Sequence, residues 1–254
     1  MRTRTTAILN MKGGVAKTTT VLNMAAILAD RGHKVLVIDG DSQCNTTDFL
    51  GGPVNCRTLA SLLRGEIDDR PEVVQSTIPG VDLLPADDSL MDLDLTKAEA
   101  GKAHVGCLKD RIRLEWGSVY DYALIDCPPA FSAATAAALI AADDAIIPMK
   151  LDAFSVRGMA NLFRQIENMR RINPQLTVAG ILPTMWYRSP QMEETERQLL
   201  RAGLPVFHHI RRSNTVDRMT FEQAPLQTFS KNSAALRDYR IFVGDYQRRA
   251  EGRR

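Results

Sequence analysis

Residues 10–20 read Asn-Met-Lys-Gly-Gly-Val-Ala-Lys-Thr-Thr-Thr and lie between two apolar segments. The run at 6–9 before them is typical of a buried strand, and the run at 21–29 after them is typical of a helix packed on a sheet. A loop between strand and helix leaves the first helical amides unpaired and directed at one point, where an anion is favoured. Gly13 and Gly14 allow the backbone to curl around that anion. The stretch therefore predicts a phosphate-binding loop.

The same loop carries side chains suited to nucleotide phosphates and to a metal ion. Lys17 is placed to reach the β- and γ-phosphates, and the Thr18 hydroxyl is placed to join the ligand shell of Mg²⁺. The strict pattern G-x-x-x-x-G-K-[ST] is not met, because Met11 and Ala16 occupy its outer glycine positions. An ordinary glycine-rich turn ahead of a helix is the alternative, but the strand-loop-helix context favours nucleotide binding.

Acidic residues follow two other predicted strands. The strand at 34–39 ends in Asp39, with Asp41 two residues later, and the strand at 122–126 ends in Asp126. Ligands bind at the carboxyl edge of open α/β sheets, and phosphate-loop enzymes place a strand-terminal aspartate near Mg²⁺. Asp39 and Asp41 could instead cap a loop or the next helix. We expect these carboxylates to approach the phosphate loop.

A second lysine, Lys12, gives residues 12–19 the sequence Lys-Gly-Gly-Val-Ala-Lys-Thr-Thr, which resembles the deviant Walker A motif of the ParA/MinD family. The segment at 39–45 resembles the first switch of that family, Asp-x-Asp-Pro-Gln-Gly-Asn, with Ser42 and Cys44 in place of the proline and the glycine. Asp-Cys-Pro-Pro at 126–129 matches the second switch. The resemblance extends from the first strand to the last helix.

The resemblance implies a role for each residue of this site, with ATP and Mg²⁺ as cofactors. Lys12 crosses a dimer interface to the phosphates held by the partner subunit, and Asp41 positions the attacking water. Asp39 and Asp126 join Thr18 near the metal. The implied nucleotide contacts are Lys12, Gly13, Gly14, Val15, Ala16, Lys17, Thr18 and Thr19. Thr46 and Thr47 are weaker candidates.

The resemblance implies an ATPase of the short, Soj-like ParA kind, with one domain at 1–254. Longer relatives carry an extra N-terminal DNA-binding domain, and we expect none here because only residues 1–4 precede the first strand. ATP closes a homodimer that binds double-stranded DNA without sequence preference. A ParB-like or other partner then stimulates hydrolysis and releases the dimer, which segregates a plasmid, a chromosome or another cargo. We expect a cytoplasmic, nucleoid-associated protein that does not act on a membrane.

The basic character of the C-terminal part agrees with a nucleic-acid partner. Residues 204–254 hold ten Lys and Arg against five acids, whereas residues 39–100 hold four against thirteen. A solvated basic helix face is the alternative. By the resemblance, the DNA-contacting residues are Arg188, Arg211, Arg212 and Arg218. Arg211 also replaces a family proline that lies near the adenine, so it could border the base instead.

Two alternative functions stay open. A MinD-like ATPase would place the basic ending at 247–254 on a membrane, although the helix before it is expected to pack in the core. A nucleotide switch with weak hydrolysis would follow if Ala16 strains a backbone that prefers glycine. An iron-sulfur reductase is disfavoured, because the four cysteines form no C-x-x-C pair.

The remaining chain alternates between strand and helix patterns, which predicts a three-layer α/β fold with a mostly parallel sheet covered on both faces. The expected later strands are 144–149, 177–183 and 205–210, and the expected helices are 58–64, 101–116, 133–142, 155–172, 191–202 and 232–249. Within the helix at 101–116, we expect Leu108, Ile112 and Leu114 to face partly inward.

Overall fold

A seven-stranded sheet forms the centre of the computed structural model, which describes residues 2–52, 55–66, 72–93 and 104–252. The strands are β1 (Arg4–Ile8), β2 (Val35–Asp39), β3 (Val74–Gln75), β4 (Val81–Leu84), β5 (Tyr122–Asp126), β6 (Asp144–Lys150) and β7 (Thr177–Thr184). Their order is β3-β4-β2-β5-β1-β6-β7, and every pairing is parallel except that of β3 with β4. The predicted mostly parallel sheet is confirmed.

The register of the central strands brings the acidic motifs together. In β5, Asp126 pairs with Ile8 at the end of β1 on one side and with Asp39 at the end of β2 on the other. The chain therefore leaves three adjacent strands at one edge of the sheet, and the loop at 9–16 leaves β1 at that edge. The parallel pairing of the strands is therefore enough to bring the acidic motifs and the loop at 9–16 to the same edge of the sheet.

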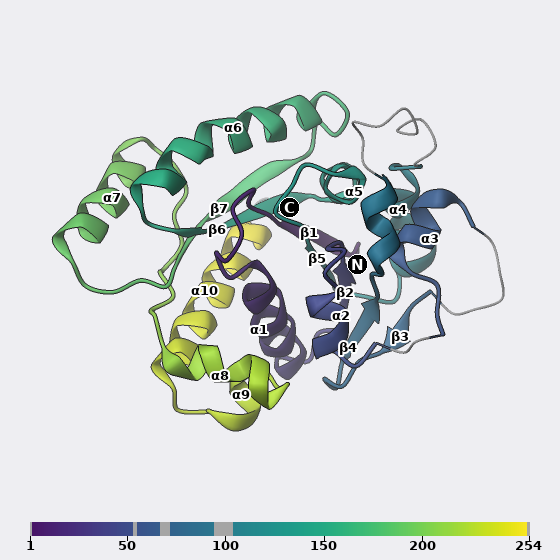
Figure 1. The fold of residues 1–254 in the computed structure, drawn as a ribbon, viewed down its shortest axis with the longest axis horizontal. Coiled ribbons are helices and arrows are strands. Elements are labelled where there is room, and N and C mark those ends of the chain that lie inside the picture. Colours follow the sequence, from purple (N-terminus) through teal and green to yellow (C-terminus); the bar gives the residue numbers. More distant parts are fainter. Residues whose placement is uncertain (1, 53–54, 67–71, 94–103, 253–254) are drawn as a thin grey trace.

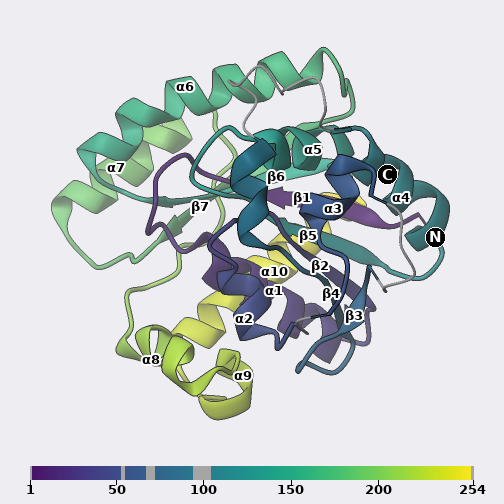
Figure 2. The same cartoon turned by 45° about the vertical axis from the view of Figure 1, so that its right-hand side comes forward.

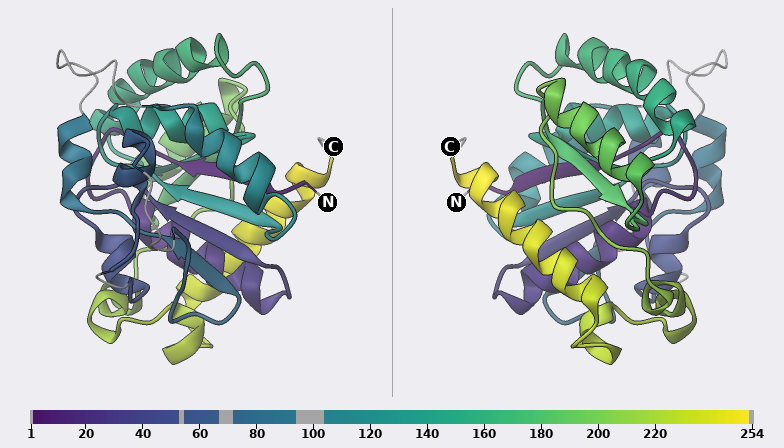
Figure 3. Two further views of the ribbon diagram at one scale, coloured as in Figure 1. Left: turned by 90° about the vertical axis from the view of Figure 1, so that its right-hand side faces the viewer. Right: turned by 90° about the vertical axis from the view of Figure 1, so that its left-hand side faces the viewer.

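Helices cover both faces of the sheet (Figure 1). The main helices are α1 (Lys17–Asp30), α3 (Leu59–Arg64), α4 (Cys107–Arg111), α5 (Ala133–Ala141), α6 (Ala153–Arg170), α7 (Pro190–Arg201) and α10 (Ala234–Glu251). One apolar core lies between the sheet and α3 to α6, and a second lies between the sheet, α1 and α10. The view in Figure 3 shows α6 and α10 on opposite sides of the sheet.

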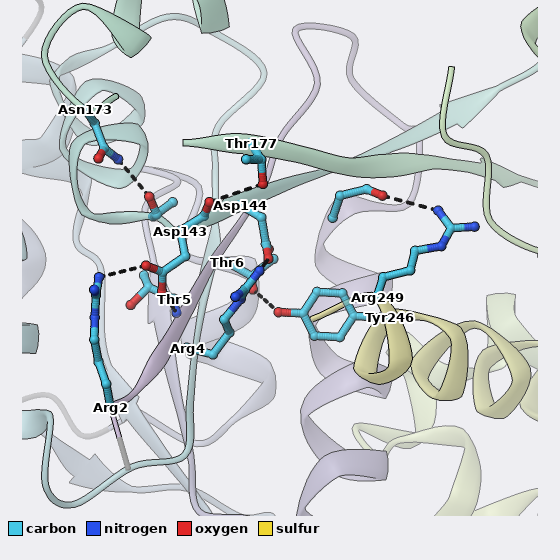
Figure 4. A network of polar contacts seen from close by, with 12 residues as sticks. Arg2, Arg4, Thr5, Thr6, Asp143, Asp144, Asn173, Thr177, Tyr246 and Arg249 are labelled. Atoms are coloured by element: carbon cyan, nitrogen blue, oxygen red, sulfur yellow. Dashed lines mark hydrogen bonds and ion pairs between the residues drawn. The ribbon is translucent and has the colours of Figure 1, made fainter. Parts of the chain in front are cut away.

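The C-terminal helix α10 is fixed to the sheet by apolar and polar contacts. Its apolar side chains are fully buried: Leu236, Tyr239, Phe242, Val243 and Tyr246. The Tyr246 hydroxyl hydrogen-bonds the hydroxyl of Thr6 in β1, and Arg249 donates to the carbonyl oxygen of Ala179 in β7 at 3.2 Å (Figure 4). This helix packs in the core, as its spacing predicted. In the described part of the chain, no helix is long and apolar enough to cross a membrane.

Two expected elements are wrong in detail. The strand at 205–210 is absent: that segment makes one isolated parallel bridge to β7, between Val206 and Ile181, and a second isolated bridge joins Arg211 to Trp186, just after the two segments. Leu114 is 82% exposed, although Leu108 and Ile112 are buried as expected. It belongs to a π-helical turn, η3 (Ile112–Trp116), whose wider period breaks the 3.6-residue pattern. Residues 101–103 of the expected helix lie outside the described residues.

Several short elements were not predicted. They are α2 (Asn45–Phe49), the 3₁₀ helix η1 (Asp88–Leu93), α8 (Asn214–Glu222) and α9 (Leu226–Phe229). In the sequence, α8 and α9 lie between α7 and α10. Figure 2 shows them next to each other, below α1 and α10 in that view. The Ser213 hydroxyl accepts a hydrogen bond from the amide of Thr215, so α8 begins with a side-chain cap beside the nucleotide cavity described below.

Candidate nucleotide-binding site

The phosphate loop contains two residues in the left-handed backbone region. Gly14 has φ 68°, and Ala16, directly before α1, has φ 66° and ψ 36°. An L-residue other than glycine pays about 1–2 kcal/mol for this conformation. Cys44 has φ 54°, and it stands where the resembled switch motif has glycine. Two positions that suit glycine therefore carry a side chain under backbone strain in this protein.

We expect Ala16→Gly to stabilise the folded protein, because relief of the strain exceeds the entropy that glycine adds to the unfolded chain. The expected gain is about 0.5–1 kcal/mol in the free energy of unfolding. Urea denaturation without nucleotide measures it. Ala202→Gly is the matched control: Ala202 ends α7 with φ −75°, so glycine there brings no relief and should destabilise the protein. A loss of stability in Ala16→Gly would contradict the argument.

Asp126 is a buried carboxylate of the site. Its Oδ2 accepts hydrogen bonds from the hydroxyls of Thr18, at 2.6 Å, and Thr46, at 2.7 Å. Its Oδ1 is buried and has no hydrogen-bond partner among the described residues. Burial raises the pKa of Asp126 to about 6, although both hydroxyls and Lys17 oppose the shift. A buried oxygen without a partner, next to two hydroxyls, is suited to a cation or to a cation-bound water.

Asp39 lies beside Asp126 in the sheet and is also fully buried. Its Oδ2 accepts from the Thr47 amide at 2.8 Å and the Thr47 hydroxyl at 2.7 Å, and its Oδ1 accepts from the Asp41 amide at 3.0 Å. Burial and the charge of Asp126 raise its pKa to about 7. Two adjacent carboxylates that disfavour each other's charge are stabilised by a divalent cation.

This donor set fits Mg²⁺. Among the described residues, no group of three or more His, Cys, Asp or Glu side chains could by itself hold a metal. Mg²⁺ is ordinarily held by one or two carboxylates together with waters and substrate phosphates, so such a group is not required. Thr18, Asp39 and Asp126 supply the hydroxyl and the carboxylates that this kind of site needs.

A cavity of about 810 Å³ begins at the phosphate loop. Gly13 to Thr19 line one part of it, together with Asp41, Gln43 and Asn45. Lys17 is buried, its Nζ donates to the carbonyl oxygen of Lys12 at 3.4 Å, and burial lowers its pKa. A buried ammonium group gains strongly from an anion. The cavity is large enough for a nucleotide.

Lys12 points to a different acid. Its Nζ lies 2.8 Å from Oδ2 and 3.0 Å from Oδ1 of Asp152, which follows β6. The two side chains are 38% and 28% exposed, so the pair lies at the surface. The backbone amide of Lys12 donates to Asn10 Oδ1 at 3.0 Å, which holds the start of the loop. Lys12 therefore lies at the rim of the site and is bound within its own subunit.

The structure separates the four predicted DNA-contacting arginines. Arg211 and Arg212 line the nucleotide cavity. Arg188 and Arg218 do not; they are 88% and 64% exposed, and each faces a nearby glutamate, Glu193 at 3.5 Å and Glu222 at 2.6 Å. Two of the four predicted arginines therefore belong to the cavity lining, and the other two are exposed outside it.

Sequence reasoning missed two acids that hold basic residues of the site, Asp152 and Asp238. Asp238 is buried on α10 and binds Arg211 through Nε at 2.7 Å and Nη2 at 2.8 Å. Neither acid belongs to a motif, and the pairs span 140 and 27 positions of sequence. The only feature of the sequence that could have indicated such an acid was an isolated aspartate within an apolar helical pattern, as at Asp238.

The parallel sheet, the glycine-containing loop ahead of α1 and the aspartates that end β2 and β5 define a phosphate-loop nucleotide hydrolase. Comparison with known proteins specifies the class. Residues 3–178 match the family described as AAA domain. The chain is 35% identical over 203 residues to the chromosome partitioning protein ParA of Caulobacter vibrioides, covering 78% of this chain and 76% of that one.

A ParA family protein of Chlamydia pneumoniae is 32% identical over 244 residues, covering 93% of this chain and 94% of that one. Among solved structures, cobyrinic acid a,c-diamide synthase of Mycobacterium smegmatis with bound ADP and magnesium superposes with a TM-score of 0.81 at 29% identity, covering 99% and 97% of the two chains. The chain belongs to the ParA/MinD family of phosphate-loop ATPases. The predicted ATPase activity and the predicted ATP and Mg²⁺ are confirmed.

Proposed function

We propose that this protein is a partition or positioning ATPase whose ATP-bound homodimer binds double-stranded DNA nonspecifically and is released by partner-stimulated hydrolysis. The main support for this proposal is the structure of the site. The loop at 12–19, with Lys12 at its rim, faces a cavity that Asp41 also lines. The similarity to partitioning proteins supports the class of function. We further propose that one ATPase domain spans residues 1–254, acts on the nucleoid in the cytoplasm and answers to a ParB-like or other partner.

The mechanism follows from where each group lies. Lys17 and the amides at the start of α1 hold the phosphate charge, because a buried ammonium group and a helix N-terminus both favour an anion. Thr18, Asp39 and Asp126 would hold Mg²⁺, which when bound neutralises charge on the phosphate oxygens. Asp41 lines the cavity, and its Oδ1 is oriented by the Gln43 amide at 3.1 Å. It can therefore orient a water for attack.

DNA binding is tested with unrelated double-stranded DNA, without nucleotide, with ADP and with ATP plus Mg²⁺, and with anionic liposomes as the alternative surface. We expect binding to DNA only with ATP, and weaker binding as salt rises, because phosphate contacts release counterions. Liposome binding in place of DNA binding would support the MinD-like alternative. DNA binding that is indifferent to nucleotide would contradict the proposed cycle.

The arginine assignment has its own control. The double variant with Arg188→Ala and Arg218→Ala should bind DNA more weakly. The logarithm of its binding constant should also depend less steeply on the logarithm of the salt concentration, by about 1 for each DNA phosphate that an arginine no longer neutralises. Arg201→Ala removes an exposed arginine of α7 that faces Glu194 at 3.8 Å, and it should change neither quantity. If the double variant behaves like the control, DNA is bound by other residues.

A nucleotide switch with weak hydrolysis is the second candidate function. Its support is the left-handed backbone of Ala16, since strain in the phosphate loop could favour a slowly reacting geometry. ATP turnover of the wild type and of Ala16→Gly distinguishes the two. If the protein follows a partition cycle, its partner should stimulate ATP turnover by the wild type. If it is a strained switch, ATP turnover should rise only in Ala16→Gly.

A further inference from the structure

Lys150 is the last residue of β6, and it lines the nucleotide cavity together with the phosphate loop. Its direction follows from the pleat of the strand, because alternate side chains point to opposite faces of a sheet. Ile147 and Met149 pack in the core on the side of α3 to α6, whereas Ile146 packs in the core on the side of α1 and α10. Lys150 lies an even number of positions from Ile146, so its side chain is on the side of α1, where the cavity lies.

The phosphate loop passes over the end of β6. Near its start, Asn10 Nδ2 donates to the Pro148 carbonyl oxygen of β6 at 2.8 Å. Near its end, the Val15 carbonyl oxygen accepts from the Thr184 hydroxyl of β7 at 3.1 Å. Since β6 lies between β1 and β7, a loop that leaves β1 and reaches β7 has to cross the end of β6. Lys150 is paired in register with Thr184, so it lies at this crossing.

The ammonium group of Lys150 has no acidic partner in the described part of the chain. Its side chain forms no ion pair and no hydrogen bond with any described residue. Asp41 and Asp217 are the acids among the described residues that line the cavity, and neither is paired with it. Lys12, by contrast, is held by Asp152 at 2.8 Å. A cation that lines a cavity without a counter-ion attracts an anionic ligand to that cavity.

We propose that Lys150 contacts the diphosphate that ADP and ATP share, as a second cation beside Lys17 from the same subunit. The loop at 9–16 directs phosphates to the start of α1, and β6 brings Lys150 to that loop from the neighbouring strand. Lys150 thus supplies charge to the cavity while Asp152 holds Lys12 at the rim. An ammonium group binds phosphate as a point charge, which suits a flexible lysine side chain. Such a contact requires neither DNA nor a dimer, so failure of the proposed DNA-binding cycle would not affect it.

The test compares Mg-ADP with Mg-pyrophosphate by calorimetry, because the two ligands share a diphosphate and only one carries a nucleoside. Lys150→Met keeps the length of the side chain and removes its charge, and we expect it to bind both ligands about 3- to 30-fold more weakly. Lys231→Met removes an exposed lysine that does not line the cavity, and it should change neither affinity. Weaker binding of ADP alone would place Lys150 on the nucleoside, and unchanged binding of both ligands would show no contact; either result overturns the proposal.

Two further measurements separate a direct contact from the field of a distant charge. Lys150→Arg keeps a long cationic side chain, so it should bind both ligands more tightly than Lys150→Met does; equal losses in the two variants would count against a charge contact. Salt screens distant charges more strongly than charges in direct contact, and the Debye length falls from about 10 Å at about 0.1 M salt to about 3 Å at about 1 M. The loss in Lys150→Met relative to the wild type should therefore persist at the higher salt concentration. If that loss disappears there, Lys150 acts only at long range and the proposed contact is wrong.

Discussion

Replacing Asp41 with alanine is expected to lower ATP turnover by about 10²- to 10⁴-fold, the range of a group that assists proton transfer or orients the attacking water. Asp41 lines the cavity, and the Gln43 amide fixes its carboxylate at 3.1 Å. It does not share the hydrogen bonds of Asp126, which come from Thr18 and Thr46. ATP affinity should therefore change little, and the ATP-bound dimer should accumulate.

Single-turnover hydrolysis and size-exclusion chromatography with ATP measure the two effects. Asp48→Ala is the matched control, because Asp48 is an exposed acid of α2 only seven positions away that does not line the cavity. It should hydrolyse ATP at the wild-type rate. Unchanged turnover in Asp41→Ala would show that this aspartate takes no part in hydrolysis. Loss of ATP binding would show that it contributes to binding ATP and not to the hydrolysis step.

Sequence reasoning predicted the centre of the fold and the site because both depend on short-range signals. The loop at 12–19 is contiguous, and Asp39 and Asp126 each end an apolar run. Once the strands are taken as parallel, their carboxyl ends must meet at one edge, and the register of Asp39 with Asp126 satisfies that requirement. The topology follows from the same alternation of strand and helix patterns.

The remaining features depend on information that a linear pattern does not contain. The sign of φ at Ala16 is set by the path of the loop, and the pairs Lys12–Asp152 and Arg211–Asp238 are set by tertiary packing. Leu114 is exposed and not buried because a π turn changes the rotation per residue of the helix. Apolar periodicity also cannot distinguish a strand at 205–210 from a segment that makes a single isolated bridge to β7, at Val206.

We expect Lys12→Ala to retain ATP binding and to lose ATP-driven dimerisation. Within its subunit, Lys12 contacts Asp152 at the rim of the cavity, while Lys17 occupies the buried position beside the phosphate loop. A partly exposed ion pair contributes about 0–1 kcal/mol, so exchange of Asp152 for a phosphate of the partner's nucleotide costs little. In a closed interface that exchange gives a charge-assisted contact that water no longer screens.

Asp152→Ala distinguishes the phosphate contact from the ion pair. It breaks the same pair as Lys12→Ala but keeps the lysine, so it should still dimerise with ATP, and at a lower ATP concentration because Lys12 no longer has to leave Asp152. Analytical ultracentrifugation with ATP and with ADP measures the monomer-dimer equilibrium of the three proteins. If both variants fail to dimerise, the ion pair maintains the loop and no lysine crosses the interface. If Lys12→Ala still dimerises with ATP, Lys12 does not hold the dimer together by crossing its interface to the partner's phosphates.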